Sequence, residues 1–87
     1  MKIRIEEHRN FRKYFAKLSP KQKTLFVQRI RIFAMNPNHS LLKTHSLEGW
    51  LKNFSAFTLG GDLRVVFQWI TKDHILLHKV GTHNQVY

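Results

Sequence analysis

Cysteine is absent from this 87-residue chain, and acidic side chains are scarce. Without cysteine, the chain has neither a disulfide framework nor a thiolate metal site, as expected in a reducing compartment. No hydrophobic run approaches the ~20 residues of a membrane-spanning helix, and the alternating N-terminus lacks the apolar stretch of a signal peptide. We therefore expect a cytoplasmic protein that is neither exported nor embedded in a membrane.

The scarcity of acidic residues leaves a large positive charge. The chain has 15 Lys and Arg against 5 Asp and Glu, a formal net charge of +10. On so short a chain this charge favours an anionic partner, such as a phosphate backbone, an anionic lipid surface or an acidic protein. Residues 1–52 hold 12 of the basic and 3 of the acidic side chains. With 43% hydrophobic residues, we expect one folded domain over residues 1–87.

The first half of the chain has the pattern of a strand followed by two helices. Apolar and charged residues alternate over residues 3–6, which predicts a short strand, and apolar residues at helical spacing predict a helix over 11–18. A second helix begins where Ser19 supplies an N-cap, Pro20 the first helical position and Gln22 the other half of a capping box. An Asn-Pro pair ends that helix.

The second half of the chain has the pattern of strands. Segments of strand-like composition at 54–59, 63–70 and 75–80 are separated by short polar turns, which favours antiparallel pairing. Residues 82–87 are interpreted as a possible further strand. The sequence thus predicts an α+β fold: a short N-terminal strand, two helices on one sheet face, and an antiparallel sheet of three to four strands whose other face is free.

Six histidines raise the question of a metal site. His74 and His78 are four residues apart in a predicted strand, so their side chains lie about 13 Å apart at the usual rise per residue. That separation is too large for one ion. We therefore expect no metal and no other cofactor, and we interpret His8, His39 and His74 as surface residues.

Polar residues with useful chemistry gather at the ends of the predicted strands. His45 lies in the connection between the helices and the sheet, Asp62 and Arg64 lie at a glycine turn, and His83 follows the last long strand. Because functional sites are often built from loops at one edge of a sheet, we predict that these four converge. The alternatives are structural: Asp62 favours the turn, Arg64 pairs with a surface carboxylate, and His83 bonds its own turn.

Three segments carry a further signal: His45–Gly49, Gly61–Phe67 and Val80–Tyr87. They resemble the RelE/ParE superfamily of toxins, on its YafQ-like branch. The resemblance implies a RelE-like, microbial-ribonuclease-like fold and a type II toxin–antitoxin toxin that cuts mRNA on the ribosome without metal. It also implies a cognate antitoxin as partner, in a heterotetramer. The chain departs from the YafQ-like pattern at Thr58, where the pattern has histidine, and at Leu63, where it has tryptophan.

The resemblance also suggests roles for single residues. His45 and His83 are assigned to proton transfer, and Asp62 either orients an imidazole or acts as a base. Arg64 is assigned to the scissile phosphate because its planar fork matches phosphate oxygens. Tyr87 is assigned to an exposed RNA base, by stacking or by a hydrogen bond, with closure of the core edge as the alternative.

Lysines outside this set are assigned to binding. Lys43 and Lys52 are expected to contact the RNA backbone. A basic flank along the helices is expected to contact ribosomal RNA or an acidic antitoxin, unless it is only a solvated face; it consists of Lys13, Lys17, Lys21 and Lys23. Phosphate contacts of this kind are insensitive to base sequence and weaken with salt.

Two other functions fit the same resemblance. A ParE-like protein shares the fold but poisons DNA gyrase, and it needs no proton-transfer residues. A relative with weakened catalysis that binds only nucleic acid or its antitoxin would explain the departures at Thr58 and Leu63. The histidines and the aspartate at YafQ-like positions favour the nuclease.

Overall fold

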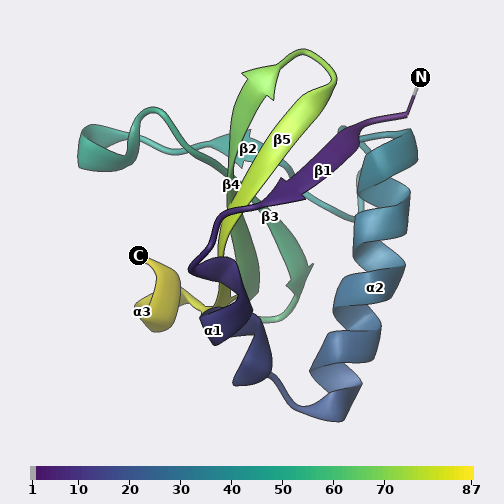
Figure 1. Ribbon diagram of the computed structural model, residues 1–87, viewed down its shortest axis with the longest axis vertical. Helices are drawn as coiled ribbons and strands as arrows, with labels where there is room; N and C mark the ends of the chain where they lie inside the picture. Colours follow the sequence, from purple (N-terminus) through teal and green to yellow (C-terminus); the bar gives the residue numbers. More distant parts are fainter. Residues whose placement is uncertain (1) are drawn as a thin grey trace.

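The computed structural model describes residues 2–87 and has the predicted α+β fold (Figure 1). Among these residues, no helix is both long enough and apolar enough to cross a membrane. The elements follow one another as β1 (Arg4–Glu7), α1 (Phe11–Ala16), α2 (Pro20–Met35), β2 (His45–Ser46), the 3₁₀ turn η1 (Gly49–Leu51), β3 (Ser55–Gly60), β4 (Leu63–Thr71), β5 (His74–Thr82) and α3 (His83–Val86).

The strands form one five-stranded sheet in the order β1-β5-β4-β3-β2. The predicted N-terminal strand and the three predicted long strands are confirmed, and β3, β4 and β5 form an antiparallel meander. The N-terminal strand joins it at the far edge, parallel to β5. The short strand β2 comes from a segment that we predicted as a polar connection, and its pairing sets His45 opposite Ala56 of β3.

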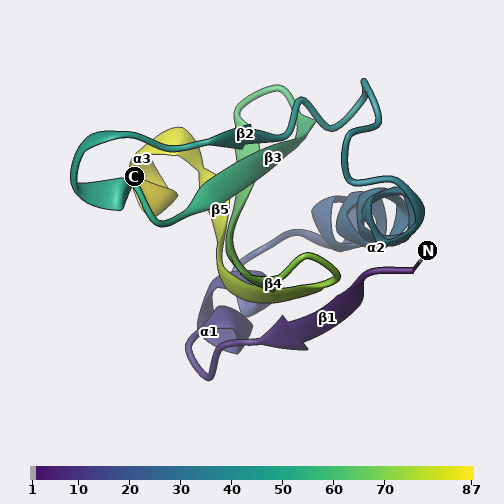
Figure 2. The same ribbon diagram turned by 90° about the horizontal axis from the view of Figure 1, so that it is seen from above.

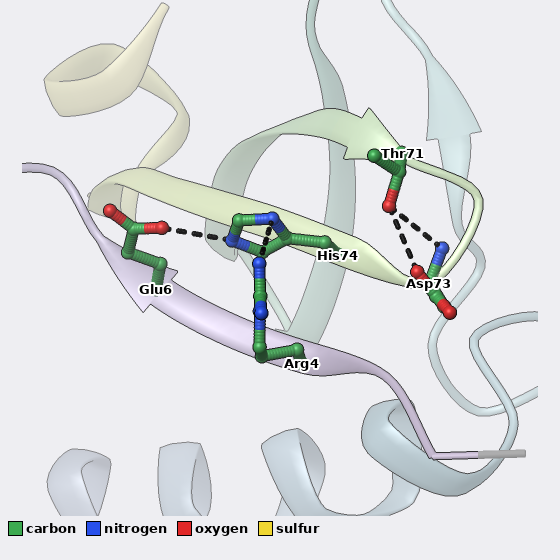
Figure 3. Close-up of polar contacts among 5 residues, drawn as sticks. All are labelled: Arg4, Glu6, Thr71, Asp73 and His74. Atoms are coloured by element: carbon green, nitrogen blue, oxygen red, sulfur yellow. Dashed lines mark hydrogen bonds and ion pairs between the residues drawn. The ribbon is translucent and has the colours of Figure 1, made fainter.

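The buried His74 of β5 forms hydrogen bonds with two side chains of β1 (Figure 3). The His74 side chain lies between two side chains of β1, with Nδ1 3.0 Å from Arg4 Nη2 and Nε2 2.9 Å from Glu6 Oε1. Arginine can only donate, so Nδ1 accepts and the neutral ring carries its hydrogen on Nε2, which donates to Glu6. The prediction that His74 is a surface residue is wrong: it is only 8% exposed, because β1 covers it.

Both α1 and α2 pack on one face of the sheet, as predicted. Helix α2 begins with the predicted capping box, in which Gln22 N–H donates to Ser19 Oγ at 3.1 Å and Ser19 N–H donates to Gln22 Oε1 at 2.8 Å. Helix α1 is shorter than predicted and ends at Ala16. One buried cluster joins both helices to the sheet; its members include Phe11, Phe26, Phe33, Phe57, Leu59, Phe67, Ile75 and Leu77.

The C-terminal segment is a helix, so the prediction of a further strand at residues 82–87 is wrong. Gln85 Oε1 accepts from Thr82 N–H at 2.8 Å, which caps the first turn of α3. This helix packs on β4 and β5 and buries Val86. Figure 2 shows α2 and α3 on opposite sides of the sheet. We had expected the second sheet face to be free, but α3 covers part of it.

Candidate active site

A cavity of about 430 Å³ opens where α2, the loop before β2 and the β3–β4 turn meet. Its wall carries three cationic side chains, from Arg29 of α2, Lys43 of the loop and Arg64 of β4. No carboxylate is among the described residues that line it. A concave surface with charge of one sign concentrates ligands of the opposite sign, so this cavity suits an anion.

Arg64 is held in place by the β3–β4 turn. Its Nη1 donates to Thr58 Oγ1 at 3.0 Å and to the Gly61 carbonyl at 3.2 Å. The same Thr58 hydroxyl oxygen accepts from Gly60 N–H at 2.9 Å. The threonine that replaces the histidine of the YafQ-like pattern thus orients the arginine. Within residues 2–87 the Arg64 guanidinium forms no ion pair, contrary to the alternative of a surface carboxylate partner.

His45 lines the same cavity and has a defined tautomer. Its Nδ1 lies 2.9 Å from the Lys43 carbonyl oxygen, which can only accept a hydrogen bond. The hydrogen of the neutral imidazole is therefore on Nδ1, and Nε2 keeps a free lone pair. The backbone of Lys43 adopts a left-handed conformation with φ of 49°, an uncommon one for a residue other than glycine. That local turn brings the Lys43 carbonyl to the ring.

Tyr87 and His83 form a pair beside Arg64. Their rings meet edge to face with centroids 4.5 Å apart. Burial raises the pKa of the Tyr87 hydroxyl, and the positive charge of nearby Arg64 partly opposes that rise. Among residues 2–87 this buried hydroxyl has no partner in good hydrogen-bonding geometry. Tyr87 therefore stays protonated near neutral pH, with a donor not committed elsewhere in the protein.

The structure brings only some of the predicted site residues together. His45, Lys43 and Arg64 share the cavity, and Tyr87 with His83 adjoins Arg64. Asp62 is exposed in the turn, does not line the cavity, and makes no hydrogen bond to either histidine within the described chain. The remaining lysines lie elsewhere: Lys52 follows η1, Lys21 and Lys23 lie in the first turns of α2, and Lys13 and Lys17 line a second groove.

Arg29 is a cavity residue that the sequence pattern did not single out. It follows Phe26 by three positions and precedes Phe33 by four, so it falls on the same helix face as these buried residues. Its Nε is buried without a hydrogen-bond partner among residues 2–87. The sequence signal that could have identified Arg29 is a charged residue at a position where the helical repeat places core residues.

The face of the sheet on the α3 side also holds an aromatic group around His78. The His78 ring stacks on His8 at 4.9 Å and meets Phe54 edge to face at 4.9 Å. Burial lowers the pKa of His78, and the charges of His8 and Lys79 lower it further. Within residues 2–87, no group of three or more His, Cys, Asp or Glu side chains lies close enough to hold a metal ion.

Replacing Gly81 by alanine should dislodge α3. A Cβ at Gly81 would lie 2.5 Å from Gln85 Oε1 and 3.2 Å from Gln85 Cβ, and the backbone φ of +159° also disfavours a side chain. Gln85 must then leave the Thr82 N–H, so the helix loses its cap. We expect a loss of about 1 kcal/mol, equivalent to roughly 4–8 °C in Tm, measured by thermal unfolding.

The Gly81→Ala variant has a second readout at Tyr87. If α3 moves away, burial no longer raises the pKa of Tyr87, which should fall back toward 10.0. A pH titration followed by NMR measures this. Gly49→Ala is the control, because a Cβ there meets no atom within 4 Å and only the positive φ opposes it. An unchanged Tyr87 pKa in Gly81→Ala would show that α3 tolerates the side chain.

The element order and sheet topology are those of the RelE- and YafQ-type toxins, so the predicted resemblance is confirmed at the level of the fold. The chain is similar to a chain of the E. coli DinJ–YafQ toxin–antitoxin complex, with a TM-score of 0.76 and 18% identity over 100% of this chain and 99% of that one. It is also similar to a chain of the archaeal RelE–RelB complex of Pyrococcus horikoshii, with a TM-score of 0.73 and 21% identity over 99% and 100%.

A third similar structure is a metal-bound toxin from Helicobacter pylori, with a TM-score of 0.69 and 26% identity over 98% of this chain and 99% of that one. No protein-family model matches the chain, and no curated protein sequence matches it significantly. The similarity to these toxins thus lies in the arrangement of helices and strands more than in the identity of the residues.

Proposed function

We propose that this protein is the toxin of a type II toxin–antitoxin system and a metal-independent endoribonuclease that cleaves mRNA on the ribosome. The observation that carries the proposal is the cationic cavity in which Arg64 faces the same space as the His45 imidazole. The fold shared with the RelE and YafQ toxins supports it. Because mRNA and ribosomes are its proposed targets, its proposed place of action is the cytoplasm.

The residues of the cavity fit the cleavage of RNA by its own 2′-hydroxyl. In this scheme His45 Nε2 removes the 2′-hydroxyl proton, and the 2′-oxygen attacks the phosphorus atom. The bond from phosphorus to the 5′-oxygen breaks, which leaves a 2′,3′-cyclic phosphate and a 5′-hydroxyl. Arg64, with Lys43 and Arg29 nearby, stabilises the extra negative charge of the phosphorane.

The leaving 5′-oxygen needs a proton, and two groups stand beside Arg64 to supply it. His83 is the candidate acid, because a protonated imidazole can give its N–H proton to the leaving oxygen. Tyr87 is assigned to the phosphate or to an unstacked base, to which its hydroxyl can donate once bound RNA displaces the side chains that cover it. Asp62, which is exposed in the turn, is assigned no proton-transfer step.

The proposed partner is a cognate antitoxin, as in the DinJ–YafQ and RelE–RelB complexes whose fold the chain shares. A net charge of +10 suits an acidic partner chain as well as RNA. We propose a heterotetramer of two toxins and two antitoxins. A short acidic reading frame next to this one is the expected source of the antitoxin.

Induced expression in bacteria tests the proposed activity. We expect growth arrest, with cleaved mRNA whose 3′ ends carry cyclic phosphate, mapped by sequencing. His45→Gln should restore growth, because glutamine has no basic nitrogen. His39→Gln is the matched control: this loop histidine also bonds the backbone, accepting from Leu41 N–H at 3.1 Å, but it does not line the cavity.

The same experiment separates the other functions. Double-strand DNA breaks that depend on gyrase, together with intact mRNA, would show that the protein is a ParE-like gyrase poison and not a nuclease. Normal growth at full expression of folded protein would leave a binding protein without cleavage. Arrest that persists unchanged in His45→Gln would refute the assignment of His45 as the base.

A further inference from the structure

A second groove, of about 630 Å³, lies at the same end of the sheet as the Arg64 cavity. It is bounded by α1, the start of α2, the ends of β4 and β5, and α3, and it shares no lining residue with the first cavity. Leu63 lines the groove, whereas its neighbour Arg64 lines the first cavity. The groove has the size of sites that hold small organic ligands.

Two lysines give this groove a positive charge. Lys13 and Lys17 are one turn apart on and just after α1, and both line it. Tyr14 lies on the same wall, with Lys17 Nζ 6.0 Å from the centre of its ring. No carboxylate is among the described lining residues. An anionic group that enters the groove therefore meets two ammonium groups and no like charge.

Two glutamines add hydrogen-bond donors to the groove. Gln22 Oε1 already accepts from Ser19 N–H at 2.8 Å, and Gln85 Oε1 from Thr82 N–H at 2.8 Å. These bonds fix both amides and leave their NH₂ groups to donate. Both glutamines line the groove. The same helix-capping geometry is thus used twice, once on each side of one cavity, and each time the NH₂ group remains able to donate.

The floor of the groove is apolar. Leu18, Leu63 and Val80 are buried core residues that also line it. A simple inorganic anion needs no such floor, whereas a ligand that joins a flat ring to an anionic group uses both the floor and the lysines. Tyr14 adds an aromatic face beside the floor, suitable for stacking.

We propose that this groove is a second nucleotide-binding site, with the phosphate on Lys13 and Lys17 and the base on the apolar floor beside Tyr14. The nucleotide is either a free mononucleotide or one unstacked nucleotide of an RNA chain. The site does not depend on the proposed cleavage reaction, because the two cavities share no residue.

Binding of adenosine 5′-monophosphate to the full chain tests the proposal, with the Arg64→Gln variant used to keep the first cavity from contributing. We expect NMR signals of Lys13, Tyr14 and Gln85 to shift. Lys13→Gln/Lys17→Gln should weaken binding at least about tenfold, because each lost ammonium removes a charge-assisted contact. Adenosine and inorganic phosphate should each bind at least about tenfold more weakly than the nucleotide.

The matched control is Lys21→Gln/Lys23→Gln, which removes the same charge from residues outside the groove. This variant should bind adenosine 5′-monophosphate with an affinity within about twofold of that of the chain that keeps both lysines, because salt screens charges that lie outside the groove. An equal loss in both double variants, or phosphate binding as tightly as the nucleotide, would overturn the site. So would shifts confined to residues around His45. The NMR spectrum also reports whether each variant is folded.

A short uridine oligonucleotide distinguishes the two sources of the nucleotide. If the oligonucleotide displaces adenosine 5′-monophosphate, as followed by the NMR signals of Lys13 and Lys17, the groove is assigned to an RNA chain. Retention of the mononucleotide would assign it to free nucleotides. Because Arg64→Gln is used throughout, a failure of the groove is distinct from a failure of the proposed cleavage, which is measured on the unmodified chain.

Discussion

Arg64→Gln is expected to lower the rate of RNA cleavage by about 10³-fold while leaving the fold intact. Arg64 is the one cation in the cavity that the β3–β4 turn holds by two hydrogen bonds, to Thr58 and to the Gly61 carbonyl. A preoriented cation stabilises a developing phosphorane without further rearrangement, and glutamine has no charge to replace it. The rate of cleavage of a defined mRNA in a translating extract measures the effect.

The control for Arg64→Gln is Arg31→Gln, which removes the same charge from an exposed position on α2 that does not line the cavity. Its cleavage rate should stay close to that of the unmodified chain. A second readout follows from Tyr87, because Arg64 opposes the rise of its pKa. Without the guanidinium, the pKa of Tyr87 should rise further. Equal cleavage rates for the two arginine variants would remove Arg64 from the reaction.

Phe33→Ala is expected to cost about 3–5 kcal/mol of unfolding free energy. Phe33 is 0% exposed, and its ring lies 4.9 Å from Phe57, 5.1 Å from Phe67 and 5.9 Å from Trp69 between ring centres. It is the side chain through which α2 packs on the middle strands. For a domain of this size the loss is a large part of the whole stability, and Tm should fall by roughly 12 °C or more.

Trp50→Ala is the control for Phe33→Ala. It also removes a large aromatic side chain, but Trp50 lies in η1 and is 83% exposed. The change should stay within about 0.5 kcal/mol, as is usual for surface substitutions. Chemical and thermal unfolding of both variants give the comparison. A similar loss in both would mean that packing on Phe33 does not dominate the core.

Local chemistry accounts for the elements that the sequence predicted correctly. The start of α2 was predicted because Ser19, Pro20 and Gln22 each satisfy a known requirement of a helix N-terminus. The strands β3 to β5 were predicted because each is a short run rich in β-branched, aromatic and other apolar residues, bounded by turn residues. In each case neighbouring residues carry the whole signal, so no knowledge of distant contacts is needed.

The errors concern short elements and distant partners. The parallel pairing of β1 with β5 joins residues about seventy positions apart, and no periodicity of either strand encodes it. The burial of His74 depends on that pairing. Helix α3 has only four residues, too few for a helical repeat, yet its Thr-x-x-Gln pattern is the same as the Ser-x-x-Gln that marked α2. That second capping signal was present in the sequence and was not used.

The candidate site was predicted in part for the same reason. His45 and Arg64 were predicted as neighbours because sites are often built from loops at one edge of a sheet, and they line one cavity. Asp62 was included because it is close in sequence, but a turn residue can point away from the site that its neighbour lines. The role of Thr58 in holding Arg64 depends on a cross-strand pair, which becomes visible only once the register of β3 and β4 is known.

The position of β1 at the edge of the sheet affects the order in which the chain folds. Synthesis runs from β1 toward β5, so β1 can pair only after β5 has been made. Contacts between such distant segments slow the closing of a fold. During synthesis, Arg4 and Glu6 therefore lack their partner His74 until β5 has been made, so this edge of the sheet closes late.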